Sequence, residues 1–368
     1  MPGPYARSGI PGRGETGRGG EMSMTMHRPA RHAVTMVEGA LRALDLTMPT
    51  DRAVERLIDR VAPGADVAAL GGSMGRNLKL TLDEVPDGWP PHIVLHVFPR
   101  YVTRSRLIAV QRVRACLGAA GLRTAVPLSW LGSTVLDCGA ARAEIEPYLL
   151  HQAAPSHEWL FAATGELHRA LARISVAVPR PLLAFHASPS SLRRGIRVTR
   201  ARLGDSPQVR AVADTAEQLI VHLRRCLPAA STLPAQLVHG DVTADNVVVA
   251  ADGSPIFLDF GFTAWRPRIH DLAFALVYEV FQTRDGRRLE PEEIAWDRLP
   301  HFIAEYERTA IPLTYAERSA LGPYAAALLL YFPATGYFVP DAAAWTKNQP
   351  PGLRLATWLL DHRSELFG

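Results

Sequence analysis

Alternation of apolar and polar residues predicts an antiparallel sheet in the first part of the chain. Leu78, Leu80 and Leu82 alternate with polar residues, which is the period of a half-buried strand. With the stretch before them, they predict two strands over 66–82 that flank a glycine-rich turn at 71–75. The same reasoning predicts further strands at 92–98, 126–135 and 143–148, with a helix at about 105–120 between them.

Apolar residues spaced by three or four positions predict helices in the rest of the chain. Such stripes run through 160–174 and 212–227, and we expect them to form core rather than a site. Two short amphipathic helices are predicted within 36–62, the second beginning at Pro49-Thr50-Asp51. The fold class is therefore α+β. We expect a tail at 1–35, a sheet-containing part at 36–150 and a helical part at 151–368.

Composition narrows the classes of protein. Of the net charge of +4 in 368 residues, the first 35 supply +3 through five arginines and two glutamates, so no basic face for nucleic acid is expected. This glycine- and proline-rich tail is typical of disorder and has no apolar segment of a secretory signal. Three isolated cysteines suit a reducing cytoplasm. The most apolar stretch, 324–340, contains Pro333 and Gly336, so we expect a buried helix, not a membrane span.

The candidate chemistry lies in 237–259. Asp241 precedes the amide of Asn246 by five residues, and Asp259 follows thirteen residues later. Phosphoryl transfer requires a positioned acceptor hydroxyl and metal ions that hold the phosphates. Asp241 fits the first task. Asn246 and Asp259 fit the second, because Mg²⁺ prefers hard oxygen ligands.

A predicted hairpin explains how these groups meet. Three valines after Asn246 read as a short strand, 251–254 as a turn and 256–258 as the returning strand. The hairpin would place Asn246 and Asp259 at the same end, with Asp241 on the loop before it. Either His239-Gly240-Asp241 or Asp259-Phe260-Gly261 alone could be an ordinary turn. Their occurrence together, in this order and with a hairpin between them, favours a catalytic site.

The segment 237–275 resembles the catalytic region of the aminoglycoside phosphotransferase and choline kinase superfamily. The resemblance implies a two-lobed protein-kinase-like fold in which Asp241, His239 and Asp271 form the catalytic set. It implies Asp241 as the base, and Asn246 and Asp259 as Mg²⁺ ligands. Asp271 would brace the loop, although an N-cap for a helix starting near residue 272 explains it equally well. His239-Gly240-Asp241, in place of the protein-kinase His-Arg-Asp, is similar to small-molecule kinases.

The resemblance also implies a site for ATP, with GTP possible. The backbone at Gly71, Gly72 and Gly75 could cradle phosphates, although a plain hairpin would look the same. Glu146-Pro147-Tyr148 resembles the hinge that contacts the adenine.

The usual lysine–glutamate pair of the N-terminal lobe is not recognisable. The strand at 92–98 holds no lysine, and no acidic residue occurs between Tyr101 and Gly121, so the pair is absent or rebuilt. Arg100, Lys79 or His96 could substitute, and we favour Arg100 because its fork matches phosphate.

The acceptor is expected to be a small molecule with a hydroxyl group, and we favour an antibiotic such as an aminoglycoside. A metabolic kinase for homoserine, choline or a sugar, or a catalytically dead binding protein, are the alternatives. Nothing indicates the oligomeric state. Arginines nearly cancel the acids after Asp271, so a solvated helix face explains the mixture equally well. The acids that could bind a cationic acceptor there are Glu279, Asp285, Glu290, Glu292, Glu293, Asp297, Glu305 and Glu307, among the aromatics Tyr278, Phe281, Trp296, Phe302 and Tyr306.

Overall fold

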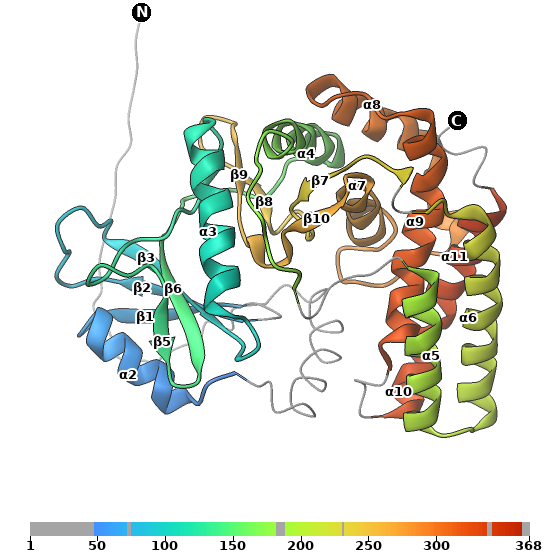
Figure 1. Ribbon diagram of the computed structural model, residues 1–368, viewed down its shortest axis with the longest axis horizontal. Helices are drawn as coiled ribbons and strands as arrows, with labels where there is room; N and C mark the ends of the chain where they lie inside the picture. The colour runs from blue at the N-terminus through green and yellow to red at the C-terminus, as the bar shows by residue number, and fades with distance from the viewer. Residues whose placement is uncertain (1–47, 72–74, 182–187, 230–231, 337–340, 363–368) are drawn as a thin grey trace, which may run out of the picture.

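The computed structural model describes residues 48–71, 75–181, 188–229, 232–336 and 341–362 (Figure 1). The predicted tail, the first predicted helix and Gly72 lie outside these residues. The predicted antiparallel sheet of the N-terminal part is confirmed; it has five strands and, among the described residues, two helices. Its strands, in spatial order, are β1 (Asp66–Gly71), β2 (Arg76–Thr81), β3 (His92–Phe98), β6 (Ala141–Pro147) and β5 (Leu136–Cys138), and its helices are α2 (Asp51–Val61) and α3 (Arg104–Ala119).

Strand alternation divides this sheet into two different faces. Ile93, Leu95 and Val97 of β3 are fully buried in one core cluster with the apolar residues of α2. The intervening residues point to the other face, where His96 lies opposite Glu144 of β6 and Val94 opposite Glu146. One face therefore supplies stability, and the other presents titratable groups toward α3.

The strand predicted at 126–135 is wrong. This stretch is irregular apart from isolated bridges such as Leu128 to Ile145. Pro127 lacks a backbone donor, and Leu131 and Gly132 have φ values of 48° and 78°, which a continuous strand does not accommodate. The chain regains strand geometry only in β5.

The C-terminal part is mainly helical and carries two small sheets. The β8–β9 hairpin has the predicted position, with β4 parallel to β9, while β7 pairs with β10. The strands are β4 (Arg123–Thr124), β7 (Ala235–Val238), β8 (Val247–Val249), β9 (Pro255–Phe257) and β10 (Ala264–Pro267). The α-helices are α4 (His157–Leu171), α5 (Pro189–Leu203), α6 (Pro207–Cys226), α7 (Ile269–Ala275), α8 (Leu299–Thr309), α9 (Tyr315–Ala334), α10 (Ala342–Asn348) and α11 (Pro350–Asp361). Short helices are η2 (Phe260–Phe262), η3 (Leu276–Val280), η4 (Pro291–Glu293) and η5 (Trp296–Arg298).

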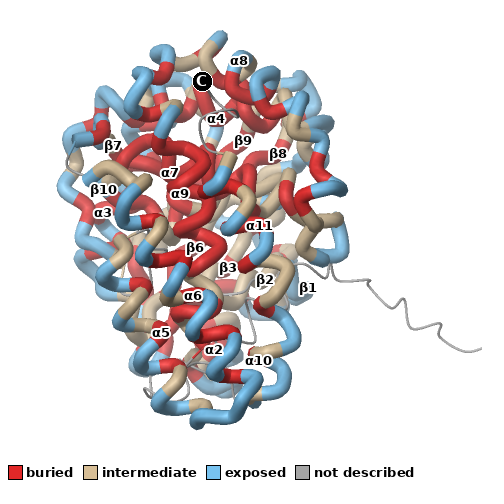
Figure 2. Tube along the Cα trace, turned by 90° about the vertical axis from the view of Figure 1, so that its right-hand side faces the viewer, coloured by how far each residue is buried: buried red, intermediate tan, exposed pale blue. Residues whose placement is uncertain are grey.

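The centre of the C-terminal part is a large apolar core. Helices α7 and α9 run through it and are red over most of their length in Figure 2. The apolar stretch that begins at Tyr324 belongs to α9, which is buried despite Pro323 and Pro333 within it. Among the described helices, none combines the length and apolar character needed to cross a membrane. The predicted division at residue 150 stays a prediction.

Candidate active site

The loop between β7 and β8 carries the predicted base, and Gly240 shapes this loop. Gly240 has φ of +88°, a region that favours glycine. A Cβ atom at this position would lie 2.4 Å from the carbonyl oxygen of Phe262. The glycine thus lets the catalytic loop approach the segment that follows Asp259.

Asp241 is oriented by Asn246. The side-chain Nδ2 of Asn246 donates to Oδ2 of Asp241 at 2.9 Å and to its backbone oxygen at 3.0 Å. Burial, and next the charge of Asp259, raise the pKa of Asp241 well above its usual range. The carboxylates of Asp241 and Asp259 thus lie near each other where water is largely excluded. This arrangement favours a proton or a cation between them.

Asp259 reaches the same place through the hairpin. The amide of Leu258 donates to the carbonyl of Asn246 at 2.8 Å, so Asp259 follows directly beside Asn246. Asp259 has a left-handed backbone with φ of 51°, and its Oδ1 accepts from the amide of Gly261 at 3.1 Å. The carboxylate of Asp259 and the amide oxygen of Asn246 are ligands that suit Mg²⁺, so the residues present fit this ion.

Asp271 binds the catalytic loop through two backbone amides. Its Oδ2 accepts from the amide of His239 at 2.8 Å, and its Oδ1 from the amide of Gly240 at 2.8 Å. Burial alone would raise the pKa of Asp271, but the hydrogen bond from His168, with Nε2 at 3.0 Å, and the nearby histidines bring it to about 2. The N-cap of α7 is Arg268. The alternative N-cap role for Asp271 is therefore wrong.

His239 joins the loop to the strand before Asp259. Its Nε2 lies 2.8 Å from the carbonyl of Leu258. A carbonyl only accepts, so Nε2 carries the proton. Burial lowers the pKa of His239 despite the nearby Asp271. These contacts position Leu258 and the loop; they do not direct the ring of His239 toward a reacting group.

A cavity of about 470 Å³ lies beside Asp259, between the sheet and the C-terminal part. Gly75, His96 and Glu146, from the predicted nucleotide set, line it together with Asp259. Of the three cations that the sequence offered, only His96 is among the described lining residues. Lys79 instead lies over the ring of Tyr148, 4.3 Å from its centroid. Arg100, Tyr148 and Gly71 are likewise outside the described lining.

The missing lysine–glutamate pair is replaced by a pair of opposite polarity. Arg114 of α3 donates to Oε2 of Glu144 at 2.7 Å and also to Glu146, and all three side chains are largely buried. Gln111 donates to the same Oε2 at 2.7 Å. The positive charge is therefore on the helix and the negative charges on the strand.

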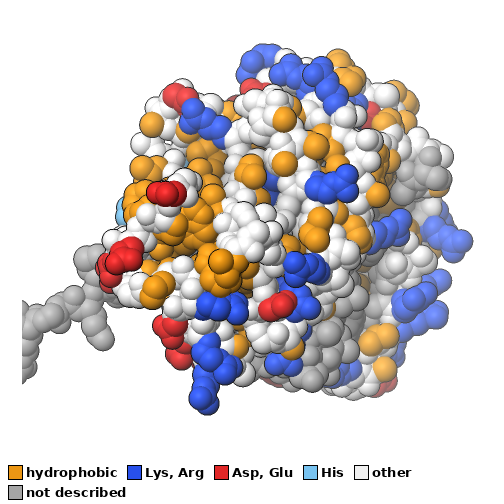
Figure 3. Space-filling view, turned by 60° about the vertical axis from the view of Figure 1, so that its left-hand side comes forward, with side chains coloured by type: hydrophobic (Ala, Val, Ile, Leu, Met, Phe, Trp, Pro, Cys, Tyr) orange, Lys and Arg blue, Asp and Glu red, His pale blue; other side chains and the backbone are white. Residues whose placement is uncertain are grey.

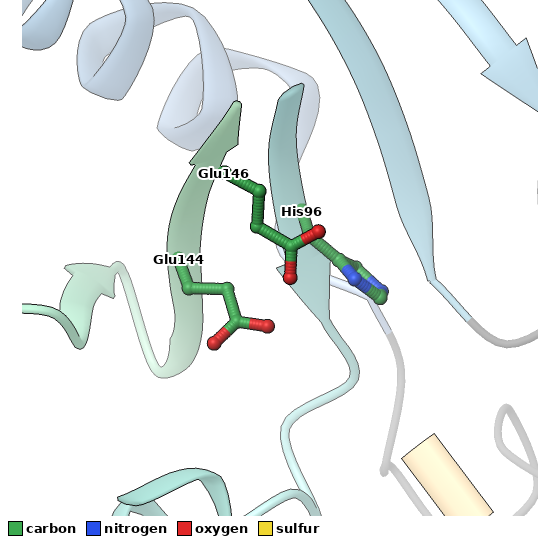
Figure 4. A group of neighbouring side chains, drawn as sticks. All are labelled: His96, Glu144 and Glu146. Atoms are coloured by element: carbon green, nitrogen blue, oxygen red, sulfur yellow. The ribbon is translucent and has the colours of Figure 1, made fainter. Parts of the chain in front are cut away.

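His96, Glu144 and Glu146 lie on one face of the sheet (Figure 4). Their potential ligand atoms are all within 4.8 Å of one another. The guanidinium of Arg114 already binds both carboxylates, so a cation is in place without a metal. Burial outweighs Arg114 and raises the pKa of Glu146 to about 8, whereas Arg114 overcomes burial and lowers the pKa of Glu144. One guanidinium thus neutralises one carboxylate, and the second retains its proton.

Arg106 is a site residue that the sequence reasoning missed. From α3 it donates to the carbonyl oxygens of Gly261 at 2.6 Å and Thr263 at 3.1 Å, and also to that of Pro179. It therefore fixes the segment after Asp259 to α3. Burial lowers its pKa to about 10. No local motif marks this residue, because all its partners are backbone groups distant in sequence.

The acids proposed for a cationic acceptor do not form one open face. Several form ion pairs with arginines, namely Glu290 with Arg354, Glu293 with Arg287, Glu305 with Arg308 and Glu307 with Arg318. Phe281, Phe302 and Tyr306 are buried in the core. Only Glu279 contacts the catalytic loop, accepting from the amide of Ala244 at 3.0 Å. The surface acids fit the alternative of a solvated helix face.

Comparison with known families decides the class. The model of the phosphotransferase enzyme family matches residues 82–310, more than half of the chain. The chain belongs to this family. This small-molecule phosphotransferase thus carries its predicted catalytic residues inside the matched region. A comparison with curated proteins finds no match.

Solved structures share the fold of this phosphotransferase at low identity. A microcompartment-associated aminopropanol kinase aligns with a TM-score of 0.63 and 14% identity, over 85% of this chain and 97% of that one. An amicoumacin kinase bound to AMP-PNP, Ca²⁺ and amicoumacin gives 0.61 and 16%, over 84% and 93%. A spectinomycin phosphotransferase in complex with ADP and spectinomycin gives 0.51 and 13%, over 84% and 98%. They confirm the two-lobed kinase-like fold.

Proposed function

We propose that this phosphotransferase moves the terminal phosphate of ATP, or of GTP, to a hydroxyl group of a small molecule. The observation that carries the proposal is the convergence of Asp241, Asn246 and Asp259. The hairpin and the hydrogen bond from Asn246 to Asp241 hold them together. Asp241 orients the acceptor hydroxyl and takes its proton as the new bond to phosphorus forms.

Asn246 and Asp259 are the residues that would hold Mg²⁺. The ion supplies charge neutralisation of the phosphates. The protein's own contribution is positional: Asp271 fixes the amides of His239 and Gly240, and His239 fixes the carbonyl of Leu258. These contacts prevent the loop from moving relative to the strand that delivers Asp259.

The nucleotide phosphates fit the cavity lined by Gly75, His96 and Asp259. Arg114 and Arg106 line the same cavity, and both are permanently charged at neutral pH. Arg114 is tied to Glu144, so its field is partly compensated. The side chain of Arg106 donates to carbonyl oxygens, which carry no full charge, and its positive charge therefore favours anions in the cavity that it lines. We propose it in place of Arg100 and Lys79.

Exchange of Asp241 tests the function. Asp241→Asn keeps the size of the side chain but removes the base, and turnover should fall by about 10²–10⁴-fold. Nucleotide affinity, measured by calorimetry, should change little. Asp245→Asn is the matched control, since Asp245 is exposed on the same loop. Equal turnover of the Asp241 variant and the wild type would refute the assignment.

The acceptor is best sought by ADP release across a panel. Four of the eight acids that could bind a cationic aminoglycoside are paired with arginines. The panel therefore covers amino alcohols, choline, homoserine and sugars beside antibiotics. If the protein binds nucleotide but no acceptor raises ADP release above the Asp241→Asn background, the dead binding protein becomes the better description.

A further inference from the structure

A second and larger cavity lies away from the catalytic loop. Its volume is about 1010 Å³, and its described walls come from α5, the end of α6, β10 and the residues Arg180 and Pro181. No aspartate or glutamate is among the described residues that line it. We call it the arginine groove after its six lining arginines: Arg180, Arg193, Arg194, Arg197, Arg224 and Arg266.

Most of these charges lack a carboxylate partner in the described parts of the chain. Among the described residues, no carboxylate forms an ion pair with any of Arg180, Arg193, Arg194, Arg197 and Arg224. By contrast, Arg200, on the same helix α5 but outside the groove, pairs with Asp205 at 2.7 Å and Asp214 at 3.2 Å. Carboxylates therefore pair with α5 outside the groove, whereas no described aspartate or glutamate lines the groove itself.

The net charge of the whole chain does not reveal that these arginines are separated from the acidic residues. Lys and Arg side chains also gather on the right-hand half of the face in Figure 3, where few Asp or Glu side chains lie among them. Like charges that line one concave wall repel one another and focus a positive potential into the groove. A bound anion would relieve that repulsion.

The start of α5 adds to the potential. Ser188, Pro189 and Ser190 line the groove and form the N-terminus of this 15-residue helix. The hydroxyl of Ser188 lies 2.8 Å from that of Ser190 and makes no side-chain cap to the backbone. Pro189 has no amide hydrogen, so the amides of Ser190 and Ser191 are the first donors at this end of the helix. Helix N-termini favour negative groups.

Arg193 provides a further sign of an unfilled site. Its Nε is buried and has no hydrogen-bond partner. A buried donor without an acceptor costs free energy unless a ligand or water supplies one. The guanidinium fork matches the paired oxygens of phosphate and carboxylate groups.

We propose that the arginine groove binds a small-molecule anion with two or more phosphate or carboxylate groups, at a site separate from Asp241. The volume is in the range of small-molecule sites. Arg180 and Pro181 line both the groove and the cleft cavity beside Asp259. An anion bound in the groove therefore touches residues that also border the nucleotide cleft.

Two probes test the proposal by calorimetry at low salt: inorganic tripolyphosphate and citrate. Arg224→Gln is the first variant, and Arg225→Gln is its matched control, because both residues are exposed at the end of α6 and only Arg224 lines the groove. We expect at least a tenfold loss of affinity in Arg224→Gln and a small change in Arg225→Gln. Arg197→Gln and Arg202→Gln form a second pair on α5, with Arg197 in the groove. The tighter probe tells whether the natural ligand is a phosphate or a carboxylate compound.

A variant of the cleft separates the groove from the cleft, because His96 lines only the cleft. The groove predicts that His96→Gln leaves the tripolyphosphate affinity near that of the wild type, whereas Arg224→Gln weakens it. A loss in His96→Gln that matches or exceeds the loss in Arg224→Gln would place the probe in the cleft and overturn the proposal. So would equal losses in the Arg224 and Arg225 variants, or no binding of either probe by the wild type. Thermal melting of each variant establishes that it is folded.

Discussion

Arg114 of α3 and Glu144 of β6 form a buried ion pair, with Nη2 2.7 Å from Oε2. The pair connects the helix to the face of the sheet that borders the nucleotide cleft, where protein kinases carry a lysine on the strand and a glutamate on the helix. An ion pair thus still connects helix and sheet, but the positive charge lies on the helix and the negative charge on the strand. One consequence is that the strand offers His96, not a lysine, to the cleft.

Loss of Arg114 should be costly. Arg114→Met leaves Glu144 buried without its partner, and breaking such pairs costs about 3–5 kcal/mol. Arg112→Met is the matched control on the same helix, because Arg112 is exposed. Urea unfolding of both variants measures the difference. Similar free energies of unfolding in the two variants would show that the pair does not hold α3 to the sheet.

Glu146 predicts a pH dependence of stability. Its carboxyl has a folded pKa of about 8, raised from 4.5 chiefly by burial. The stabilising contribution of the protonated group is complete below the unfolded pKa and is lost as the pH rises through the folded pKa. Glu146→Gln keeps a neutral group, so its melting temperature should fall less than that of the wild type between about pH 5 and pH 9.

The surface variant Glu84→Gln serves as the control for this pH series, since Glu84 is exposed. Its melting curve should follow that of the wild type at every pH. Parallel curves for wild type and Glu146→Gln would mean that Glu146 is ionised in the folded protein throughout.

Local features of the chain were predictable, whereas distant pairings were not. The valines after Asn246 and the turn at 251–254 specify the β8–β9 hairpin, because a hairpin depends on neighbouring residues. The meeting of Asn246 and Asp259 follows directly. Arg114 and Glu144 are thirty residues apart on different elements, and no spacing rule connects them.

The failures have different origins, one of them local. The strand expected at 126–135 gave too little weight to Pro127 and Gly132, which interrupt the backbone pattern. Arg106 went unnoticed because it binds carbonyl oxygens, which every residue has. The arginine groove was hidden by a net charge that averages separate surfaces.

Asp271 should act as a positioning residue. Asp271→Asn replaces one acceptor oxygen by a donor that faces the amide of Gly240 or His239. An unsatisfied buried donor costs about 1–3 kcal/mol, and the loop should shift. We expect turnover to fall at least tenfold while nucleotide affinity stays near that of the wild type. Asp285→Asn, an exposed control, should change neither. Loss of nucleotide binding in step with turnover would contradict a role confined to the loop.

Gly240 and Gly253 allow two effects of a glycine-to-alanine substitution to be separated: the steric clash of the added Cβ atom and the strain of a left-handed backbone. Gly240 and Gly253 have φ of +88° and +84°. An added Cβ meets the carbonyl oxygen of Phe262 at 2.4 Å in the first case and nothing within 4 Å in the second. Gly253→Ala should therefore cost only the strain of a left-handed alanine, about 1–2 kcal/mol.

Gly240→Ala bears the same strain and must also push the loop away from Phe262, since a backbone oxygen cannot rotate aside as a side chain can. We expect it to destabilise the protein more than Gly253→Ala and to reduce turnover steeply, because Asp241 moves with the loop. Thermal melting and an ADP-release assay on both variants give the comparison. If the two alanines cost the same stability and Gly240→Ala keeps full turnover, the close approach to Phe262 does not set the position of Asp241.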